Sequence, residues 1–479
     1  MFKKYFNNFL HYAVIIALLF PFRFGISHLL YLANSSKSKA FIVVITLMFL
    51  FSIYYYNRGH KKLKVNFDSI NDKKLLPTII ISAFILRLLW IIAVPTQPVS
   101  DFELIYQTAG QASAGNFTSF QGIAYFARFT HNVVTVLYFS IFYKFTANPL
   151  FLIKFSNVIF QTASIYALYL VAKQLFNKEK ALLCAIIMAF FPPFIMYTSE
   201  IMSENLAMPI YLFSIYLFLR GIDTDKNKFF IISGVLLSAA NMFRMVGIIF
   251  IIAYIVYNFI YKGIKLGLKN NVITLASYLI PLYLVSQSLI SAGVTDTHLW
   301  KPKESNFTSI LRGSSIQYNG RWNVEDASLP EKYNYDMDKV NAAAKEIVIK
   351  RYTTTPFLKL TSHFINKLSM QWGIGDFGAS GWTIQNADNT SVGSALKYRY
   401  YEIYFVTQLI YLIMLIRIFI VMLKKDYVQI EKINFFYILF GGFILLYLIS
   451  ENQERYSFIV SWIFIILQLG FTPKLNNAK

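Results

Sequence analysis

The chain has 479 residues, of which 56% are hydrophobic, 18% aromatic and only 14% charged, and its formal net charge is +21. Soluble domains carry roughly a quarter charged residues, so this composition excludes an ordinary soluble enzyme and predicts an integral membrane protein, with lipids as its first partners. The Lys and Arg residues lie between apolar segments. That distribution is the positive-inside bias of membrane loops and argues against nucleic acid as a partner.

The sequence indicates no resident cofactor and no metal site. The single cysteine, Cys184, lies in an apolar run, so the chain cannot form an internal disulfide. The histidines are scattered without the spacing of metal ligands. No phosphate-cradling glycine loop, nucleophile elbow or zinc motif is present.

Apolar segments recur along the whole chain, and a membrane-spanning helix needs about 20 mainly apolar residues. The first run follows Lys3 and Lys4 without a small-residue cleavage site, which favours an uncleaved helix over a signal peptide. We therefore predict an all-α polytopic membrane protein with about 12–13 transmembrane helices. The candidate spans are residues 10–32, 40–56, 76–94, 131–145, 150–171, 181–197, 206–219, 229–242, 246–261, 272–290, 401–423, 435–449 and 457–469.

Loop charges give these spans a predicted orientation. Lys and Arg cluster at residues 57–74, 220–228, 262–269 and 424–432, which predicts cytoplasmic loops. In residues 95–130 the only Lys or Arg is Arg128, which predicts an outer loop. Alternation then places Asp101 and three further segments outside the cytoplasm, namely residues 200–204, 291–399 and 451–456.

One stretch conflicts with this orientation. Lys173, Lys178 and Lys180 have the composition of a cytoplasmic loop, yet two apolar segments separate them from the outer loop. Either residues 131–145 re-enter without crossing, or these lysines break the bias.

The predicted organisation has four parts. Residues 1–75 form two extra transmembrane helices and a basic cytoplasmic loop, and residues 76–290 form the core, with the first outer loop at 95–130. Residues 291–400 alone have soluble composition and are expected to form an extracytoplasmic lid, with a helix at 337–352. Residues 401–479 form the C-terminal transmembrane helices.

Charge beside a membrane helix is costly and marks functional candidates. Asp101 follows the span at 76–94 and precedes an amphipathic stretch, which suits a general base that meets a substrate from the membrane. The alternative is a solvated helix cap. Glu200 and Glu204 are either first-turn acids favoured by the helix dipole or acids that line an outward cavity.

Arginines on the outer side are not explained by the positive-inside bias. Arg244 and Arg455 are therefore candidate phosphate ligands, the alternative being an ion pair with an acid such as Glu454. Arg87 lies in the middle of a span, where it either pairs with an acid or snorkels.

Several of these segments resemble a known family. They are ILRLLW at 85–90, PVSDF at 98–102, the stretches 192–204 and 234–244, GRWN at 320–323, Asp326, Lys367, Trp372 and ERY at 454–456. In this order the pattern is similar to the polyprenyl-phosphate-sugar-dependent glycosyltransferases of the GT-C fold, the relatives of protein O-mannosyltransferases and of the lipid A aminoarabinose transferase. It extends from about residue 76 to the C-terminus. Close relatives often have two adjacent acids where this chain has Asp101, Phe102 and Glu103.

The resemblance implies a cell-membrane enzyme with an extracytoplasmic active site. It would transfer a monosaccharide, with inversion, from a polyprenyl-phosphate donor to a surface glycan, a lipid-linked sugar or a protein. Asp101 would be the general base. The implied substrate-binding residues are Glu103, Glu204, Arg244, Arg455, Tyr456, Arg87, Arg321, Trp322 and Lys367.

The residues fit this chemistry independently. A phosphate leaving group needs charge stabilisation but no proton, so a single carboxylate suffices, whereas a glycosidase uses two. Two alternatives stay open. One is a flippase or transporter of lipid-linked saccharides, which should show paired halves with interrupted helices that we do not find in the sequence. The other is a glycan polymerase or ligase with a lipid-diphosphate donor.

Overall fold

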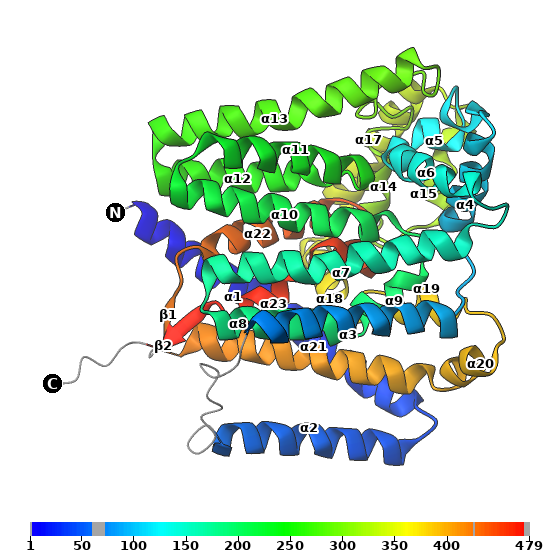
Figure 1. Cartoon of the computed structure of the whole chain (residues 1–479). Helices are drawn as coiled ribbons and strands as arrows, with labels where there is room; N and C mark the ends of the chain where they lie inside the picture. The colour runs from blue at the N-terminus through cyan, green and yellow to red at the C-terminus, as the bar shows by residue number, and fades with distance from the viewer. Residues whose placement is uncertain (1, 60–71, 425–426, 474–479) are drawn as a thin grey trace.

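A computed structural model describes residues 2–59, 72–424 and 427–473, and most of the predicted basic loop at 57–74 lies outside these ranges. The predicted all-α polytopic architecture is confirmed: long helices lie side by side in one bundle (Figure 1). Six helices in the described part are long and apolar enough to cross a membrane. They are α1 (Phe2–Ser35), α3 (Asp72–Ala93), α7 (Leu150–Leu175), α10 (Ser203–Thr224), α13 (Ile264–Ser291) and α21 (Tyr400–Leu423).

Further apolar helices complete the bundle. A seventh span is broken: α8 (Lys178–Phe190) meets the segment Pro193–Ser199 at an angle of 61°. Proline fixes its own backbone and disfavours helix in the residue before it, so Pro192 and Pro193 account for this break. The shorter apolar helices are α2 (Lys39–Gly59), α11 (Asn227–Phe243), α12 (Gly247–Lys262) and α22 (Ile433–Ile449).

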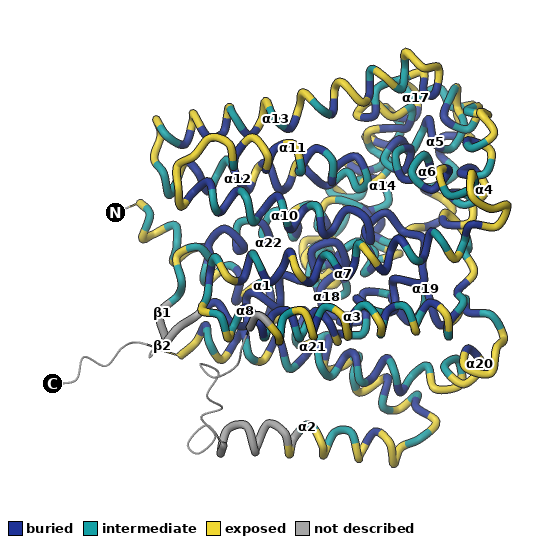
Figure 2. Tube along the Cα trace, in the orientation of Figure 1, coloured by how far each residue is buried: buried dark blue, intermediate teal, exposed yellow. Residues whose placement is uncertain are grey.

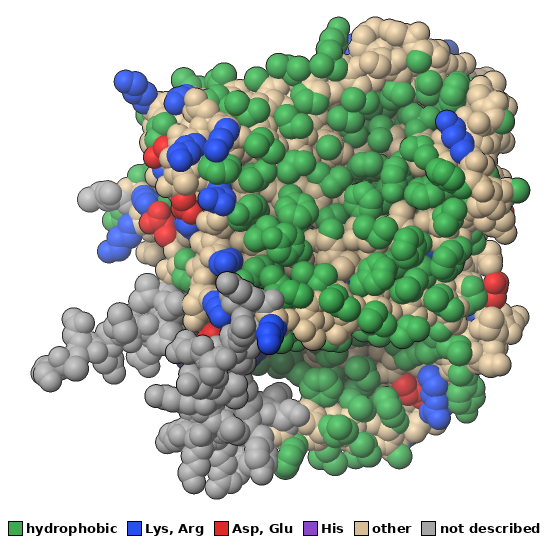
Figure 3. All heavy atoms as spheres, viewed as in Figure 1, with side chains coloured by type: hydrophobic (Ala, Val, Ile, Leu, Met, Phe, Trp, Pro, Cys, Tyr) green, Lys and Arg blue, Asp and Glu red, His purple; other side chains and the backbone are tan. Residues whose placement is uncertain are grey.

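The two ends of the bundle differ in composition. Most Lys and Arg side chains on the face in Figure 3 gather at the end where α12 meets α13, and a broad hydrophobic band separates them from the other end. We call the first the basic end. There Lys262 pairs with Asp225 at 2.7 Å, and β1 (Tyr427–Gln429) pairs antiparallel with β2 (Phe471–Pro473).

Short helices and loops cover the opposite end, which we call the loop end (Figure 1). The predicted helix at 337–352 is confirmed as α17 (Met337–Thr354). From there α18 (Phe357–Gly373) packs against α1 and α22. The other short helices are α4 (Asp101–Ser113), α5 (Tyr125–Arg128), α6 (Val133–Ser140), α9 (Pro193–Met196), α14 (Thr308–Gly313), α15 (Val324–Ala327), α16 (Leu329–Lys332), α19 (Ala379–Thr383) and α20 (Ser391–Tyr398).

The prediction of a transmembrane helix at residues 131–145 is wrong. α6 has only 8 residues, about 12 Å of helix, and packs beside α4 at the loop end. Its apolar residues Val133, Val136 and Phe139 are fully buried against protein. The next crossing is α7, which brings Lys173 to the basic end, so the conflict over the lysines disappears.

The last predicted span, 457–469, is not a regular α-helix. It consists of the 3₁₀ helix η6 (Glu454–Val460) and the short helix α23 (Ile463–Leu467). It starts at the loop end and reaches the basic end, where Lys180 Nζ donates to the Leu469 carbonyl at 3.0 Å. A 3₁₀ helix rises about 2.0 Å per residue against about 1.5 Å in an α-helix, so fewer residues cover the distance. Its side chains are almost all buried. Irregular backbone is tolerated at membrane depth when protein covers it in this way.

The two N-terminal helices differ in how they join the bundle. α1 packs against α18 and α21. Gly25 permits this close approach, since a Cβ there would lie 3.0 Å from the Gly373 carbonyl. Gln408 Nε2 donates to the carbonyls of both glycines. By contrast, α2 lies at the edge of the bundle (Figure 1) and joins it through Ile42, which is buried in a small cluster with Leu32, Tyr404 and Phe405. The most buried part of the bundle follows α7 and α10 (Figure 2).

Candidate functional site

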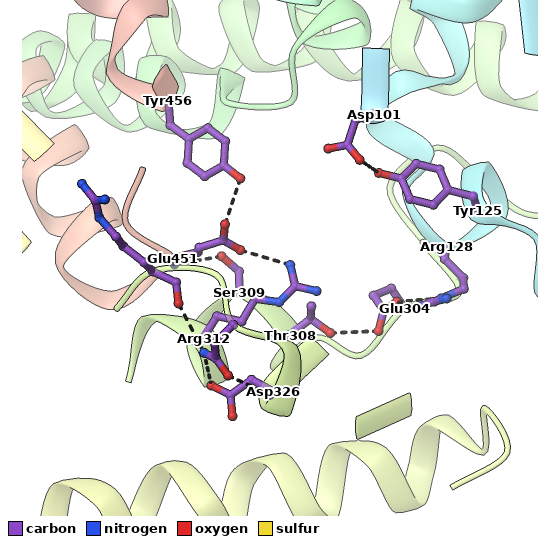
Figure 4. A network of polar contacts seen from close by, with 12 residues as sticks. Asp101, Tyr125, Arg128, Glu304, Thr308, Ser309, Arg312, Asp326, Glu451 and Tyr456 are labelled. Atoms are coloured by element: carbon purple, nitrogen blue, oxygen red, sulfur yellow. Dashed lines mark hydrogen bonds and ion pairs between the residues drawn. The ribbon is translucent and has the colours of Figure 1, made fainter. Parts of the chain in front are cut away.

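Asp101 is an exposed, oriented carboxylate at the first residue of α4. The preceding residue, Ser100, has φ of 55°, a backbone conformation that costs a non-glycine residue free energy and is enriched at functional sites. Phe102 and Ile105 bury one face of α4 and anchor it. The Tyr125 hydroxyl donates to Asp101 Oδ1 at 2.9 Å (Figure 4). In the described part of the chain Oδ2 has no hydrogen-bond donor, so it remains available to a substrate.

Arg455 is a buried cation that forms no direct ion pair with another described residue. The residue is 8% exposed, and its guanidinium carbon lies 4.8 Å from the centre of the Phe102 ring and 4.7 Å from that of Trp382. Among the described residues no acceptor hydrogen-bonds its side chain, and its Nε is fully buried. Burial lowers the pKa of Arg455, but the neighbouring Tyr456, Glu204 and Asp101 raise it above its usual value overall, so the guanidinium is charged and has no direct ion pair. Such a group can bind a further anion.

A second arginine lies close by and is partly neutralised. Arg244 pairs with Glu204 at 3.3 Å, and its guanidinium carbon lies 5.4 Å from the centre of the Tyr456 ring. The Tyr211 hydroxyl donates to the Arg244 carbonyl at 2.6 Å and fixes the chain at the end of α11. Glu204 therefore lies in the first turn of α10 and also pairs with Arg244. We call Asp101, Tyr125, Glu204, Arg244 and Arg455 the Asp101 site.

The surroundings of the two arginines keep neighbouring groups neutral. Burial, with Arg244 and Arg455 nearby, lowers the pKa of His131 to about 3, so this histidine is uncharged at pH 7. Glu200 does not join the ion pairs: burial raises the pKa of its carboxyl to about 8, and it accepts a bond from its neighbour's backbone. The positive charge of the two arginines is thus not offset by Glu200.

Residues 291–400 are attached beside this site by ion pairs. Arg312 of α14 donates to Glu451 at 3.1 Å, and the Tyr456 hydroxyl donates to the same carboxylate at 3.2 Å. Figure 4 shows Asp101 and Tyr456 on opposite sides of one polar cluster, with Glu451 and Arg312 beneath them. Arg128 Nε donates to Glu304 at 2.7 Å and attaches the same segment to α5.

Four of the predicted substrate-binding residues have other surroundings. Glu103 is exposed and accepts a bond from Gln107 within α4. Arg321 is 43% exposed in its side chain and pairs with Glu454 at 3.2 Å, and Trp322 is 53% exposed. Lys367 is buried, and its Nζ donates at 2.8 Å to the carbonyls of Gly313 and Ser450, so it ties α14 to the end of α22.

Arg87 lies away from the arginines of the site. It is fully buried, and its guanidinium donates to the carbonyls of Ala83, Met188 and Ala189 at 3.0–3.2 Å. Two of these carbonyls are at the C-terminal end of α8, before the proline break. Arg87 therefore binds carbonyls that the broken helix leaves without an intrahelical partner.

We expect Arg87→Ala to destabilise the protein, because it leaves buried carbonyls unpaired at about 1–3 kcal/mol each. Thermal unfolding in detergent should show a lower midpoint than for the wild type. The control is Arg321→Ala, which removes an exposed arginine and should leave the midpoint within error. Equal midpoints for the two variants would contradict this structural role.

The structure adds residues that the sequence patterns did not indicate. Tyr125, His131 and Trp382 all contact or face the site. They come from irregular loop-end segments, where no periodicity distinguishes one aromatic residue from another. The nearest signal is that Trp382 lies in the only stretch of soluble composition.

Comparison with known proteins gives a partial match. Residues 130–290, about a third of the chain, match the family described as dolichyl-phosphate-mannose-protein mannosyltransferase. No curated protein sequence matches the chain significantly.

Two solved structures are similar at low identity. One is the archaeal oligosaccharyltransferase AglB from Archaeoglobus fulgidus, in complex with an inhibitory peptide and a dolichol-phosphate. It has a TM-score of 0.44 and 12% identity over 83% of this chain, which spans 50% of that protein's length. The other is ArnT from Cupriavidus metallidurans bound to undecaprenyl phosphate, with a TM-score of 0.36 and 12% identity over 82% of this chain and 77% of the other.

The matched residues include Arg244 and Glu204 of the Asp101 site, together with α7, α10, α11, α12 and α13. Residues 130–290 therefore carry the sequence pattern of the dolichyl-phosphate-mannose-protein mannosyltransferase family, in agreement with the predicted resemblance over that third of the chain.

Proposed function

We propose that this protein transfers a monosaccharide from a polyprenyl-phosphate donor to a hydroxyl acceptor, with inversion at the anomeric carbon. The observation that carries the proposal is Arg455, a buried guanidinium without a direct ion pair or hydrogen bond among the described residues, near the exposed carboxylate of Asp101. A lipid-linked phosphate is an anion that could pair with this guanidinium. The family match at residues 130–290 supports the same donor class.

The arginines would bind the donor phosphate. Arg455 provides a planar fork that matches phosphate oxygens, and its guanidinium lies against the Phe102 and Trp382 rings. Arg244, already paired with Glu204, would add the second positive charge. As the bond from the anomeric carbon to the phosphate oxygen breaks, the electron pair moves onto the phosphate, and these arginines stabilise the charge that develops.

Asp101 would accept the proton of the attacking hydroxyl. The acceptor oxygen forms the new bond to the anomeric carbon from the face opposite the departing phosphate, and its proton goes to Asp101 Oδ2. Tyr125 holds the other carboxylate oxygen. Burial and the negative charge of Asp101 raise the pKa of the Tyr125 hydroxyl, so it stays a donor throughout.

The acceptor would approach from the loop end. Glu103, Arg321 and Trp322 are exposed there, beside the segment attached next to the Asp101 site. We propose that this end faces away from the cytoplasm of a cell membrane, because the basic loops lie at the other end. The acceptor class would then be a surface glycan, a lipid-linked sugar or a protein.

The direct test uses the purified full chain with labelled polyprenyl-phosphate monosaccharides and a panel of these acceptors. Time-dependent transfer of label to an acceptor, with release of polyprenyl phosphate, is the expected result. Transfer from a lipid-diphosphate donor instead would favour a polymerase or ligase. Movement of label across proteoliposome membranes without any covalent product would favour a flippase.

The orientation has its own test in a Cys184→Ser background. Ile123 and Val392 are exposed at the loop end, and Lys226 is exposed at the basic end. Single cysteines at positions 123 and 392 should react with an impermeant thiol reagent in intact cells, and one at position 226 only after permeabilisation. The reverse pattern would place the Asp101 site in the cytoplasm and end the proposal of an extracytoplasmic acceptor.

A further inference from the structure

A cavity of about 330 Å³ lies at the loop end, and Trp382 forms part of its lining. Asp376, Trp382, Asn386, Tyr400, Tyr404 and Glu454 line it. Pockets for small molecules run from about 300 to 1,000 Å³, so this one suits a small ligand. The cavity adjoins the Asp101 site, because the Trp382 ring also contacts Phe102 and Arg455.

Several polar atoms of the lining make no hydrogen bond with other described residues. Within the described ranges the Tyr400 hydroxyl, the Tyr404 hydroxyl and the Trp382 indole N–H have no hydrogen-bond partner. The side-chain amide oxygen of Asn386 is equally free. Three donors and an acceptor therefore surround the cavity, each attached to or beside an aromatic ring. A ligand with several hydroxyl groups and an apolar ring face satisfies such a lining, since a hydroxyl both donates and accepts.

The charges of the lining favour a neutral ligand. The lining contains two acids, Asp376 and Glu454, and no Lys or Arg. Glu454 is already paired with Arg321, so the lining has little net charge for a strongly cationic ligand. Burial, with Glu454 nearby, raises the pKa of Asp376 to about 7, so this carboxyl is partly protonated at neutral pH.

We propose that this cavity binds one sugar ring, an assignment that rests on the proposed glycosyl transfer. The ring stacks between aromatic side chains, and its hydroxyls bond to Tyr400, Tyr404 and Asn386. Because Arg455 lies against Trp382, the sugar and the donor phosphate occupy neighbouring positions. The sugar belongs either to the donor or to a glycan acceptor.

The cavity can be filled without disturbing the fold. Gly381 lines it with an ordinary φ, and a Cβ at this position would meet only the Tyr400 hydroxyl, at 3.8 Å. Gly381→Leu therefore projects a side chain into the cavity. The matched control is Gly441→Leu, another helical glycine, on α22, whose Cβ would meet nothing within 4 Å.

The test measures binding of methyl hexopyranosides and methyl N-acetylhexosaminides to the purified full chain by saturation-transfer NMR. We expect binding to the wild type, to Gly441→Leu and to Asp101→Asn, and none to Gly381→Leu. Tyr400→Phe and Tyr404→Phe keep the rings and lose one hydrogen bond each, so affinity should fall about 3- to 10-fold. Binding by Asp101→Asn separates this assignment from the transfer reaction.

Two results would overturn the sugar site: no glycoside binding to the wild type, or unchanged binding to Gly381→Leu. Tetramethylammonium binding that Gly381→Leu abolishes, without glycoside binding, would show a cation cage instead. In the transfer assay, a higher KM of Tyr404→Phe for the donor assigns the site to the donor sugar, and a higher KM for the acceptor assigns it to the acceptor. No change in either KM would contradict the assignment.

Discussion

Asp101→Asn is expected to lower the rate of sugar transfer by about 10²- to 10⁴-fold, the usual contribution of a general base. The amide keeps the shape of the carboxyl and still accepts the Tyr125 hydrogen bond through its oxygen, but it cannot accept a proton at pH 7. Asp101 is exposed, so the fold should not change. Donor binding should be nearly unaffected, because Arg455 and Arg244 carry the phosphate contacts. The measurement is kcat with saturating donor, beside direct binding of the donor lipid.

The neighbouring acids serve as controls for that result. Glu103→Gln changes an exposed residue two positions away, and Glu204→Gln weakens the support of Arg244 without removing a base. Smaller losses are expected from both. Near-native transfer by Asp101→Asn, with Glu103→Gln or Glu204→Gln inactive, would identify a different carboxylate as the base. Full activity of all three variants would exclude this mechanism and favour a transporter.

The sequence was sufficient to name the charged residues of this site as candidates, but not to predict which side chains contact one another. Asp101 could be predicted because an acid after a membrane helix, in a loop almost free of cations, is unusual in itself. Arg244 and Arg455 could be named as candidates because the loop charges predict that both face outward, where the positive-inside bias does not explain an arginine. The contact between Arg455 and Trp382 could not, since it depends on how η6 and α19 meet in the folded chain.

Hydropathy also has a physical limit, which the segment at 131–145 illustrates. Val133, Val136 and Phe139 leave water whether lipid or protein covers them, so a run of such residues predicts burial but not its partner. The same limit applies to Arg87. A guanidinium in a span needs acceptors, and sequence cannot distinguish a substrate from the carbonyls of a broken helix.

Arg455 should be the residue on which donor affinity depends most. We expect Arg455→Met to weaken binding of the polyprenyl-phosphate sugar by about 10²-fold, because hydrogen bonds to a charged group contribute about 1.5–3 kcal/mol each. Arg455→Lys keeps the charge but loses the two-pronged geometry, so an intermediate loss of about 10-fold is expected. Arg321→Met is the matched control, since that arginine is 43% exposed and already paired.

Stability gives this prediction a second, independent measurement. Arg455 makes no direct ion pair or hydrogen bond among the described residues and has a burial cost, whereas methionine can pack against Phe102 and Trp382 without a charge to desolvate. Without donor, Arg455→Met should therefore unfold at the same temperature as the wild type or higher. With donor, the wild type should gain stability and the variant should not, because only a bound ligand shifts the folding equilibrium. A lower unfolding midpoint for Arg455→Met without donor would mean that Arg455 stabilises the fold and is not kept for binding phosphate.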